Sequence, residues 1–238
     1  MKSFLKRASI LLFIYKNTIF ALSGGFGYFM MGSQMFSDIS SLNSEMLVRG
    51  YPEISNSGIS IGGGGHAVVD RVIIGGEGSG ILTKKSGNSN FSVDYSYGYG
   101  CFDLGYVVYN SKSIFVYPML GIGGGGMTLS IFEKTLPSFG DVLDNPKRGV
   151  VITTGGLLLN FSLGLDYLLK VEDSYESRNV EKRGVGGFVV GIRTGYILSV
   201  VKSDWSLPNE VVLSNSPQVG LDGFYIKVLI GFSGYEIK

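Results

Sequence analysis

The sequence predicts an all-β chain, an eight-stranded antiparallel up-and-down transmembrane β-barrel with short periplasmic turns and longer outer loops. The first observation is alternation: every second residue from Leu157 to Leu169 is large and apolar, while Asn160, Ser162 and Asp166 lie between them. The second is length, because an ordinary soluble strand has only about 5 to 6 residues. The third is composition, which combines 37 glycines, 14 tyrosines and 15 phenylalanines with 16% charged residues. Together these observations indicate strands with one face toward lipid.

Extended runs of this kind recur along the chain. We expect strands at residues 25–36, 57–68, 72–83, 90–109, 114–132, 150–171, 185–202 and 222–236. The connections at 69–71 and 110–113 are short, whereas those at 37–56, 133–149 and 203–221 are long. An even number of strands, with tight turns at one end and longer loops at the other, is typical of membrane barrels. In the first long loop, residues 41–50 place apolar side chains at helical spacing, so we expect one short helix there.

The fourth expected strand changes phase along its length. Tyr95 and Tyr99 share one face, whereas Phe102 and Tyr106 share the other. Turning both sets toward lipid requires an extra residue between them. We therefore expect a β-bulge near Gly100 and Cys101.

Two other architectures fit parts of the pattern. Helical membrane spans are conceivable at 113–132 and 149–165, which carry no charge, but the first contains Pro118 and several glycines and the second alternates with period two. A water-soluble barrel or sandwich would show the same alternation with its apolar face inward. Long strands and low charge favour the lipid-facing barrel.

The first residues have the pattern of an export signal. Lys2, Lys6 and Arg7 precede an apolar run at 8–15, and Ala21 and Ser23 are small residues at the spacing of a signal-peptidase site. We expect a signal peptide at 1–23 and a single outer-membrane barrel domain at 24–238.

Composition also limits the function. A net charge of +1 leaves no basic field for a polyanion, so nucleic acid is not an expected partner. Cys101 and His66 are the only cysteine and histidine, so no thiolate or imidazole metal site is expected. The glycine-rich stretch 121–126 matches the residue spacing of a dinucleotide-binding motif, but no helical pattern follows it. We therefore predict no metal, no cofactor and no catalytic residue.

Charged residues inside the expected strands predict a filled lumen. Asp166, Arg193 and Lys227 alternate with lipid-facing residues in the last three strands, and Glu77 does so in the third. An unpaired charge in a narrow lumen would cost several kcal/mol, whereas hydrogen-bonded pairs offset much of this cost. We expect these four side chains to form a lumenal polar network that closes the barrel. We also expect Asp94 and Asp103 to line the interior.

On these strands and loops, the chain resembles the small eight-stranded outer-membrane barrels of Gram-negative bacteria. The resemblance rests on the pattern over almost the whole mature chain, and no specific motif carries it. It implies a location in the outer membrane, contact with outer-membrane lipid and lipopolysaccharide, and insertion by the barrel-assembly machinery.

The resulting hypothesis is a structural or surface-interaction protein that acts through its outer loops. One alternative is a lipid-modifying outer-membrane enzyme centred on His66, although a lone histidine near a strand end is more often an interfacial or turn residue. A second alternative is a narrow channel or small-ligand carrier, because inward glycines leave space in the lumen.

Overall fold

The computed structural model describes residues 22–111, 113–134, 138–144, 149–171 and 183–237. The expected signal peptide at 1–23 lies almost wholly outside these ranges, and Leu22 and Ser23 belong to the first strand. No helix in the described ranges is both long and apolar enough to cross a membrane.

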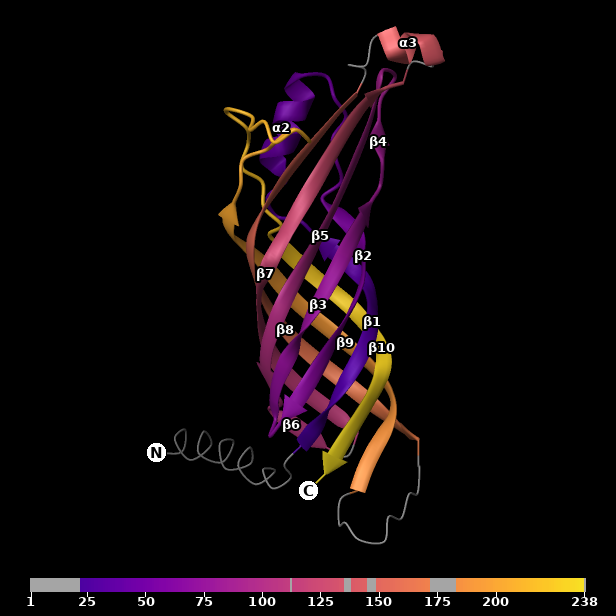
Figure 1. Cartoon of the computed structure of the whole chain (residues 1–238), viewed down its shortest axis with the longest axis vertical. Helices are drawn as coiled ribbons and strands as arrows, with labels where there is room; N and C mark the ends of the chain where they lie inside the picture. Colours follow the sequence, from indigo (N-terminus) through magenta and orange to yellow (C-terminus); the bar gives the residue numbers. More distant parts are fainter. Residues whose placement is uncertain (1–21, 112, 135–137, 145–148, 172–182, 238) are drawn as a thin grey trace, which may run out of the picture.

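Eight long strands close into one antiparallel barrel (Figure 1). They are β1 (Leu22–Met35), β2 (Ser57–Val69), β3 (Val72–Thr83), β5 (Phe91–Tyr106), β7 (Ile114–Glu133), β8 (Gly149–Val171), β9 (Arg183–Lys202) and β10 (Gly223–Ile237). Each pairs with its neighbour in this order, and β10 pairs with β1 to complete the ring. This confirms the predicted fold class.

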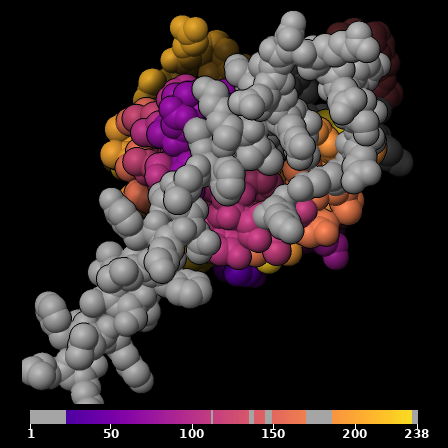
Figure 2. Space-filling model, turned by 90° about the horizontal axis from the view of Figure 1, so that it is seen from below, coloured from indigo at the N-terminus to yellow at the C-terminus, as the bar shows by residue number. Residues whose placement is uncertain are grey.

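The connections separate into two ends, which we call the loop end and the terminus end. The loop end carries α2 (Ser40–Val48), β4 (Ser86–Gly87), α3 (Phe139–Asp144) and the loop 203–222, and the terminus end carries the start of β1, the end of β10 and β6 (Tyr109–Ser111) (Figure 1). Figure 2 looks onto the terminus end, where magenta residues near the β5–β7 connection and orange residues of β9 form visible parts of the surface. The expected helix in the first long loop is α2, whereas α3, β4 and β6 were not predicted.

The expected β-bulge in the fourth strand is wrong. The pairing of β5 with β3 and β7 runs without a shift through Gly100 and Cys101. Tyr95 and Tyr99 therefore point into the lumen, and Phe102 points outward from the same uninterrupted strand. A register shift occurs instead in the β8–β9 pair, between Leu157 and Leu158.

The outer surface carries an apolar belt. On β8 it comprises Leu157, Phe161, Leu163, Leu165, Tyr167 and Leu169, and on β10 it comprises Phe224, Ile226, Val228, Ile230 and Phe232, each with two-fifths or more of its surface exposed. Similar residues continue the belt over the other strands. Asp94, which was expected inside, lies above the belt on the outside of β5 and forms an ion pair with Lys85.

Two apolar clusters fill the two ends of the lumen. The loop-end cluster includes Phe36, Leu42, Tyr95, Trp205 and Leu221. The terminus-end cluster includes Phe26, Ile73, Phe115, Val189 and Leu229. Charged residues lie between them in the strand sequences. On β9 Arg193 stands between Val189 and Ile197, and on β3 Glu77 stands between Ile73 and Ile81.

Candidate functional site

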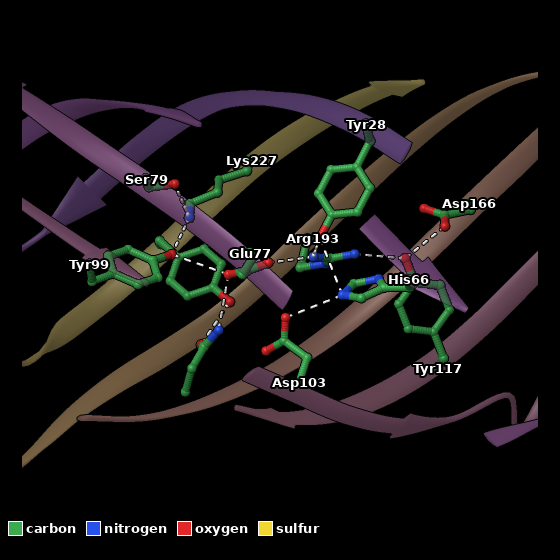
Figure 3. Close-up of polar contacts among 12 residues, drawn as sticks. Tyr28, His66, Glu77, Ser79, Tyr99, Asp103, Tyr117, Asp166, Arg193 and Lys227 are labelled. Carbon is green, nitrogen blue, oxygen red and sulfur yellow. Dashed lines mark hydrogen bonds and ion pairs between the residues drawn. The ribbon is translucent and has the colours of Figure 1, made fainter. Parts of the chain in front are cut away.

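The polar layer between the two apolar clusters is the candidate functional site (Figure 3). Its central contact is an ion pair between Arg193 of β9 and Glu77 of β3. Both side chains are completely buried. Because a buried charge is expensive unless it is paired and hydrogen-bonded, the neighbours of this pair decide whether the layer is tolerated.

Tyrosines supply the remaining contacts of the guanidinium group. Arg193 Nη1 donates to the hydroxyl of Tyr28 at 2.9 Å, and Nη2 donates to the hydroxyl of Tyr117 at 3.1 Å. The guanidinium carbon also lies 4.9 Å from the centre of the Tyr28 ring, which is within cation–π range. Tyr117 in turn donates to Asp166 Oδ2 at 2.7 Å. Arg193 is therefore linked to a second carboxylate through one hydroxyl group.

The carboxylate of Glu77 is held from its other side as well. Its Oε1 accepts hydrogen bonds from Asn160 Nδ2 at 3.1 Å and from the Tyr99 hydroxyl at 3.3 Å. Tyr225 donates to Asn160 Oδ1 at 2.9 Å. These contacts spread the negative charge over several donors, as a buried carboxylate requires.

Lys227 is the second cation of the layer. Its Nζ donates to the Tyr99 hydroxyl and to Ser79 Oγ, the latter at 3.1 Å. It lies 4.4 Å from the centre of the Tyr225 ring. The structure thus brings together the four residues singled out from the sequence, Glu77, Asp166, Arg193 and Lys227. Only Arg193 and Glu77 pair directly, since Asp166 and Lys227 join through tyrosines.

His66 and Asp103 form a second contact in the same layer. His66 Nε2 lies 3.2 Å from Asp103 Oδ2 and 3.3 Å from the Tyr28 hydroxyl, and both side chains of the His66–Asp103 pair are fully buried. The expectation that His66 is an interfacial or turn residue is wrong, because it faces the lumen. The expectation that Asp103 lines the interior is correct. Tyr99 and Asp103 are an even number of residues apart, so they point to the same face of an uninterrupted strand. The assumed bulge placed them on opposite faces.

Inward glycines make room for the tyrosines. Tyr28 is paired across the sheet with Gly64, and Tyr117 with Gly164. A Cβ atom on Gly64 would lie 2.6 Å from the Tyr28 hydroxyl, and one on Gly164 would lie 2.3 Å from Tyr117 Cε2. The rings therefore lie directly over the backbone of the neighbouring strand. Glycine at these positions leaves room for the tyrosine rings, and these rings fill the space that the missing side chains would otherwise leave open.

Every one of the eight long strands contributes to the layer. The contributors, in strand order, are Tyr28, His66, Glu77, Ser79, Tyr99, Asp103, Tyr117, Asn160, Asp166, Arg193, Tyr225 and Lys227. Within the described ranges, no group of three or more His, Cys, Asp or Glu side chains is arranged to hold a metal ion. The geometry can cross-link the barrel wall, because its ion pair and hydrogen bonds join strands that are not neighbours in the sheet.

No protein-family model and no curated protein sequence matches the chain. Solved structures match over most of their length. Ail, the attachment invasion locus protein of Yersinia pestis, solved with the heparin analogue sucrose octasulfate, is 10% identical, with 91% of this chain and 98% of that chain covered and a TM-score of 0.41. A major outer membrane protein from Thermus thermophilus is 10% identical, with coverage of 89% and 98% and a TM-score of 0.40. The outer membrane protease OmpT from Escherichia coli is 12% identical, with coverage of 91% and 95% and a TM-score of 0.29.

Proposed function

We propose that the protein is an outer-membrane β-barrel whose lumen is closed and whose loop end carries a structural or surface-interaction role. The observation that carries the proposal is the apolar belt. In the described strands, the outward positions from Ile59 to Val69 on β2, from Phe188 to Val200 on β9 and from Phe224 to Phe232 on β10 include no charged residue. Water would be a poor solvent for so much exposed apolar surface, whereas the hydrocarbon core of a bilayer suits it.

The contents of the lumen argue against a pore. A solute would have to cross the loop-end cluster, the charged layer and the terminus-end cluster in turn. An eight-stranded barrel has an interior just wide enough for its own side chains. We therefore expect the inserted protein to conduct no ions across a planar bilayer. Sustained single-channel currents from the purified protein would favour the channel alternative instead.

Burial of His66 also weighs against the lipid-modifying alternative. His66 is 4% exposed, and its contacts are Asp103 and Tyr28 inside the lumen. A lipid substrate would reach an outward-facing side chain far more easily than this one. We expect His66→Ala to leave the lipid composition of the envelope unchanged.

The loop end offers the surface for interaction. Strands β5, β7 and β8 extend past their neighbours there, because β9 pairs with β8 only as far as Gly156, whereas β7 pairs with it up to Gly149. Figure 1 shows α3 at the far end of this extension. Phe139 and Leu143 of α3 are 80% and 67% exposed. Exposed apolar residues on a projecting segment are typical of contact surfaces.

Membrane fractionation, followed by electrophoresis of unheated and boiled samples, tests the proposal. We expect the protein in the outer-membrane fraction and a folded species that changes mobility on boiling, because a closed hydrogen-bonded barrel resists detergent at room temperature. Recovery in the soluble fraction would contradict the membrane location. Deletion of residues 134–148 should leave the heat-modifiable species intact while removing any binding that this extension provides.

A further inference from the structure

Two loops fold inward over the mouth of the barrel at the loop end, and together we call them the lid. The first is 37–56, which buries Leu42 and Met46, and the second is 203–222, which buries Trp205 and Leu221. Their buried side chains meet Tyr97 and other residues of the barrel wall in the loop-end cluster. Apolar contact of this kind is not directional, so it does not by itself fix the position of the lid.

Each loop of the lid is held together by its own hydrogen bonds. Asn43 Nδ2 donates to the carbonyl oxygen of Ile54 at 3.0 Å, and the amide of Ile54 donates back to Asn43 Oδ1 at 2.9 Å. In the second loop, Trp205 Nε1 donates to the carbonyl oxygen of Pro217 at 2.9 Å. Bonds within a loop survive movement of that loop as a unit. Hydrogen bonds also attach each loop to the barrel wall: the amide and carbonyl groups of Ser206 pair with those of Thr153 on β8, and the Tyr95 hydroxyl donates to the carbonyl oxygen of Ser55. Ion pairs lie at the roots of the loops.

Lys202, the last residue of β9, ties both roots to the barrel wall. Its Nζ forms ion pairs with Asp38, at the start of the first loop, and with Asp222 Oδ2 at 3.3 Å, at the end of the second. Asp222 Oδ1 accepts a hydrogen bond from the Ser199 amide at 3.0 Å, and its carbonyl oxygen accepts one from the Ser37 amide at 2.9 Å. We call Lys202, Asp38 and Asp222 the clamp.

The packing beside the clamp is incomplete. A cavity of about 10 Å³ lies there, with Lys202, Ser199, Thr154 and Leu221 among the residues that line it. The lysine side chain is 25% exposed, so solvent reaches the clamp. We propose that loops 37–56 and 203–222 form a hinged lid, whose closed position depends on the Lys202 clamp in addition to the hydrogen bonds to Thr153 and Tyr95. Release of the clamp uncovers the loop end of the lumen, while the terminus-end cluster still seals the barrel.

Trp205 gives a direct measure of the lid because it is the only tryptophan of the chain and is 1% exposed. The test is acrylamide quenching of tryptophan fluorescence in the folded, detergent-solubilised full chain. We expect Lys202→Met to raise the quenching constant several-fold and to shift the emission to longer wavelength. Lys202→Arg, which keeps the charge and the reach, should restore most of the protection. Quenching of Lys202→Met at the wild-type level would overturn the proposal.

Lys85→Met is the matched control, because it removes the same side chain from an ion pair with Asp94 that lies outside the lid. It should leave the quenching of Trp205 unchanged, and an equal increase in this variant would contradict a specific role for the clamp. The heat-modifiable mobility of each variant checks that the barrel is folded. If Lys202→Met does not fold, Asp38→Asn provides a milder release at the root of the first loop, with the same criteria.

A conductance measurement separates a lid from a gate. We expect Lys202→Met to expose Trp205 without producing ion currents, because Phe26, Phe115 and Leu229 still close the other end. Currents in this variant would mean that the lid alone seals the barrel, which contradicts the proposal as stated.

Discussion

Arg193 and Glu77 lie 116 residues apart in the sequence and form a completely buried ion pair across the lumen. The pair connects β9 to β3, which are not neighbours in the barrel wall. Backbone hydrogen bonds join only adjacent strands, so this contact links opposite parts of the ring. Tyr28 and Tyr117 extend the link to β1 and β7.

Removing the charge of Glu77 should be costly. We expect Glu77→Gln to lower the free energy of unfolding by about 3 to 5 kcal/mol, because Arg193 would remain buried without its counter-charge. Urea unfolding of the refolded protein in lipid vesicles measures this change. The double variant Glu77→Met/Arg193→Met should recover a large part of the loss, since a well-packed apolar pair replaces an ion pair at little net cost. Additive losses in the double variant would show that the two residues do not depend on each other.

An arginine in the belt should also destabilise the inserted barrel. Leu163 is 50% exposed near the middle of the β8 belt. We expect Leu163→Arg to cost about 2 to 4 kcal/mol if the residue lies near the bilayer midplane. The control is Ser130→Arg on the outward face of β7, beside Asp94 and above the belt, which should cost much less. Equal costs in vesicles would mean that the belt does not face lipid.

The sequence predicts the eight long strands well for a physical reason. A strand between lipid and a packed lumen is constrained on both faces, so alternation such as that from Leu157 to Leu169 is strong. The same alternation of inward and outward residues correctly predicts that Glu77 and Arg193 point into the lumen. Their direct pairing could not be predicted, because it depends on the registers of all the strands between β3 and β9.

Tyrosine explains the main error in the sequence analysis. Its ring is apolar and its hydroxyl is polar, so Tyr95 and Tyr99 fit a lipid-facing surface and a lumen equally well in an alternation pattern. Interpreting them as lipid-facing required a bulge, and it left Tyr99 out of the predicted lumenal network, where it bonds to Glu77 and Lys227. The helix α3 and the loop 203–222 have no periodic signal over a useful length, so the sequence could not predict their structure.

The tight turn between β2 and β3 contains backbone strain. Asp70 and Arg71 have φ values of +48° and +76°, in the left-handed region that β-branched and bulky residues avoid. We expect Arg71→Gly to raise the free energy of unfolding by about 1 kcal/mol, because glycine adopts this conformation without a steric cost. The hydrogen bond from the Val107 amide to the carbonyl oxygen of residue 71 should persist. A loss of stability would show that the Arg71 side chain contributes more than the strain costs.

The glycine at position 164 has a different role from the glycine at position 80, although both lie within strands. A Cβ on Gly164 would meet the ring of Tyr117 at 2.3 Å, whereas one on Gly80 would meet nothing within 4 Å. We expect Gly164→Ala to lower the free energy of unfolding by about 1 to 3 kcal/mol, because Tyr117 must move and weaken its bonds to Arg193 and Asp166. Gly80→Ala should be neutral or raise stability by about 0.5 to 1 kcal/mol, since alanine loses less backbone entropy on folding. Urea unfolding of both variants in vesicles measures the difference. If Gly164→Ala is as harmless as Gly80→Ala, Tyr117 is not held against the wall of β8, and the charged layer is looser than the ring contacts imply.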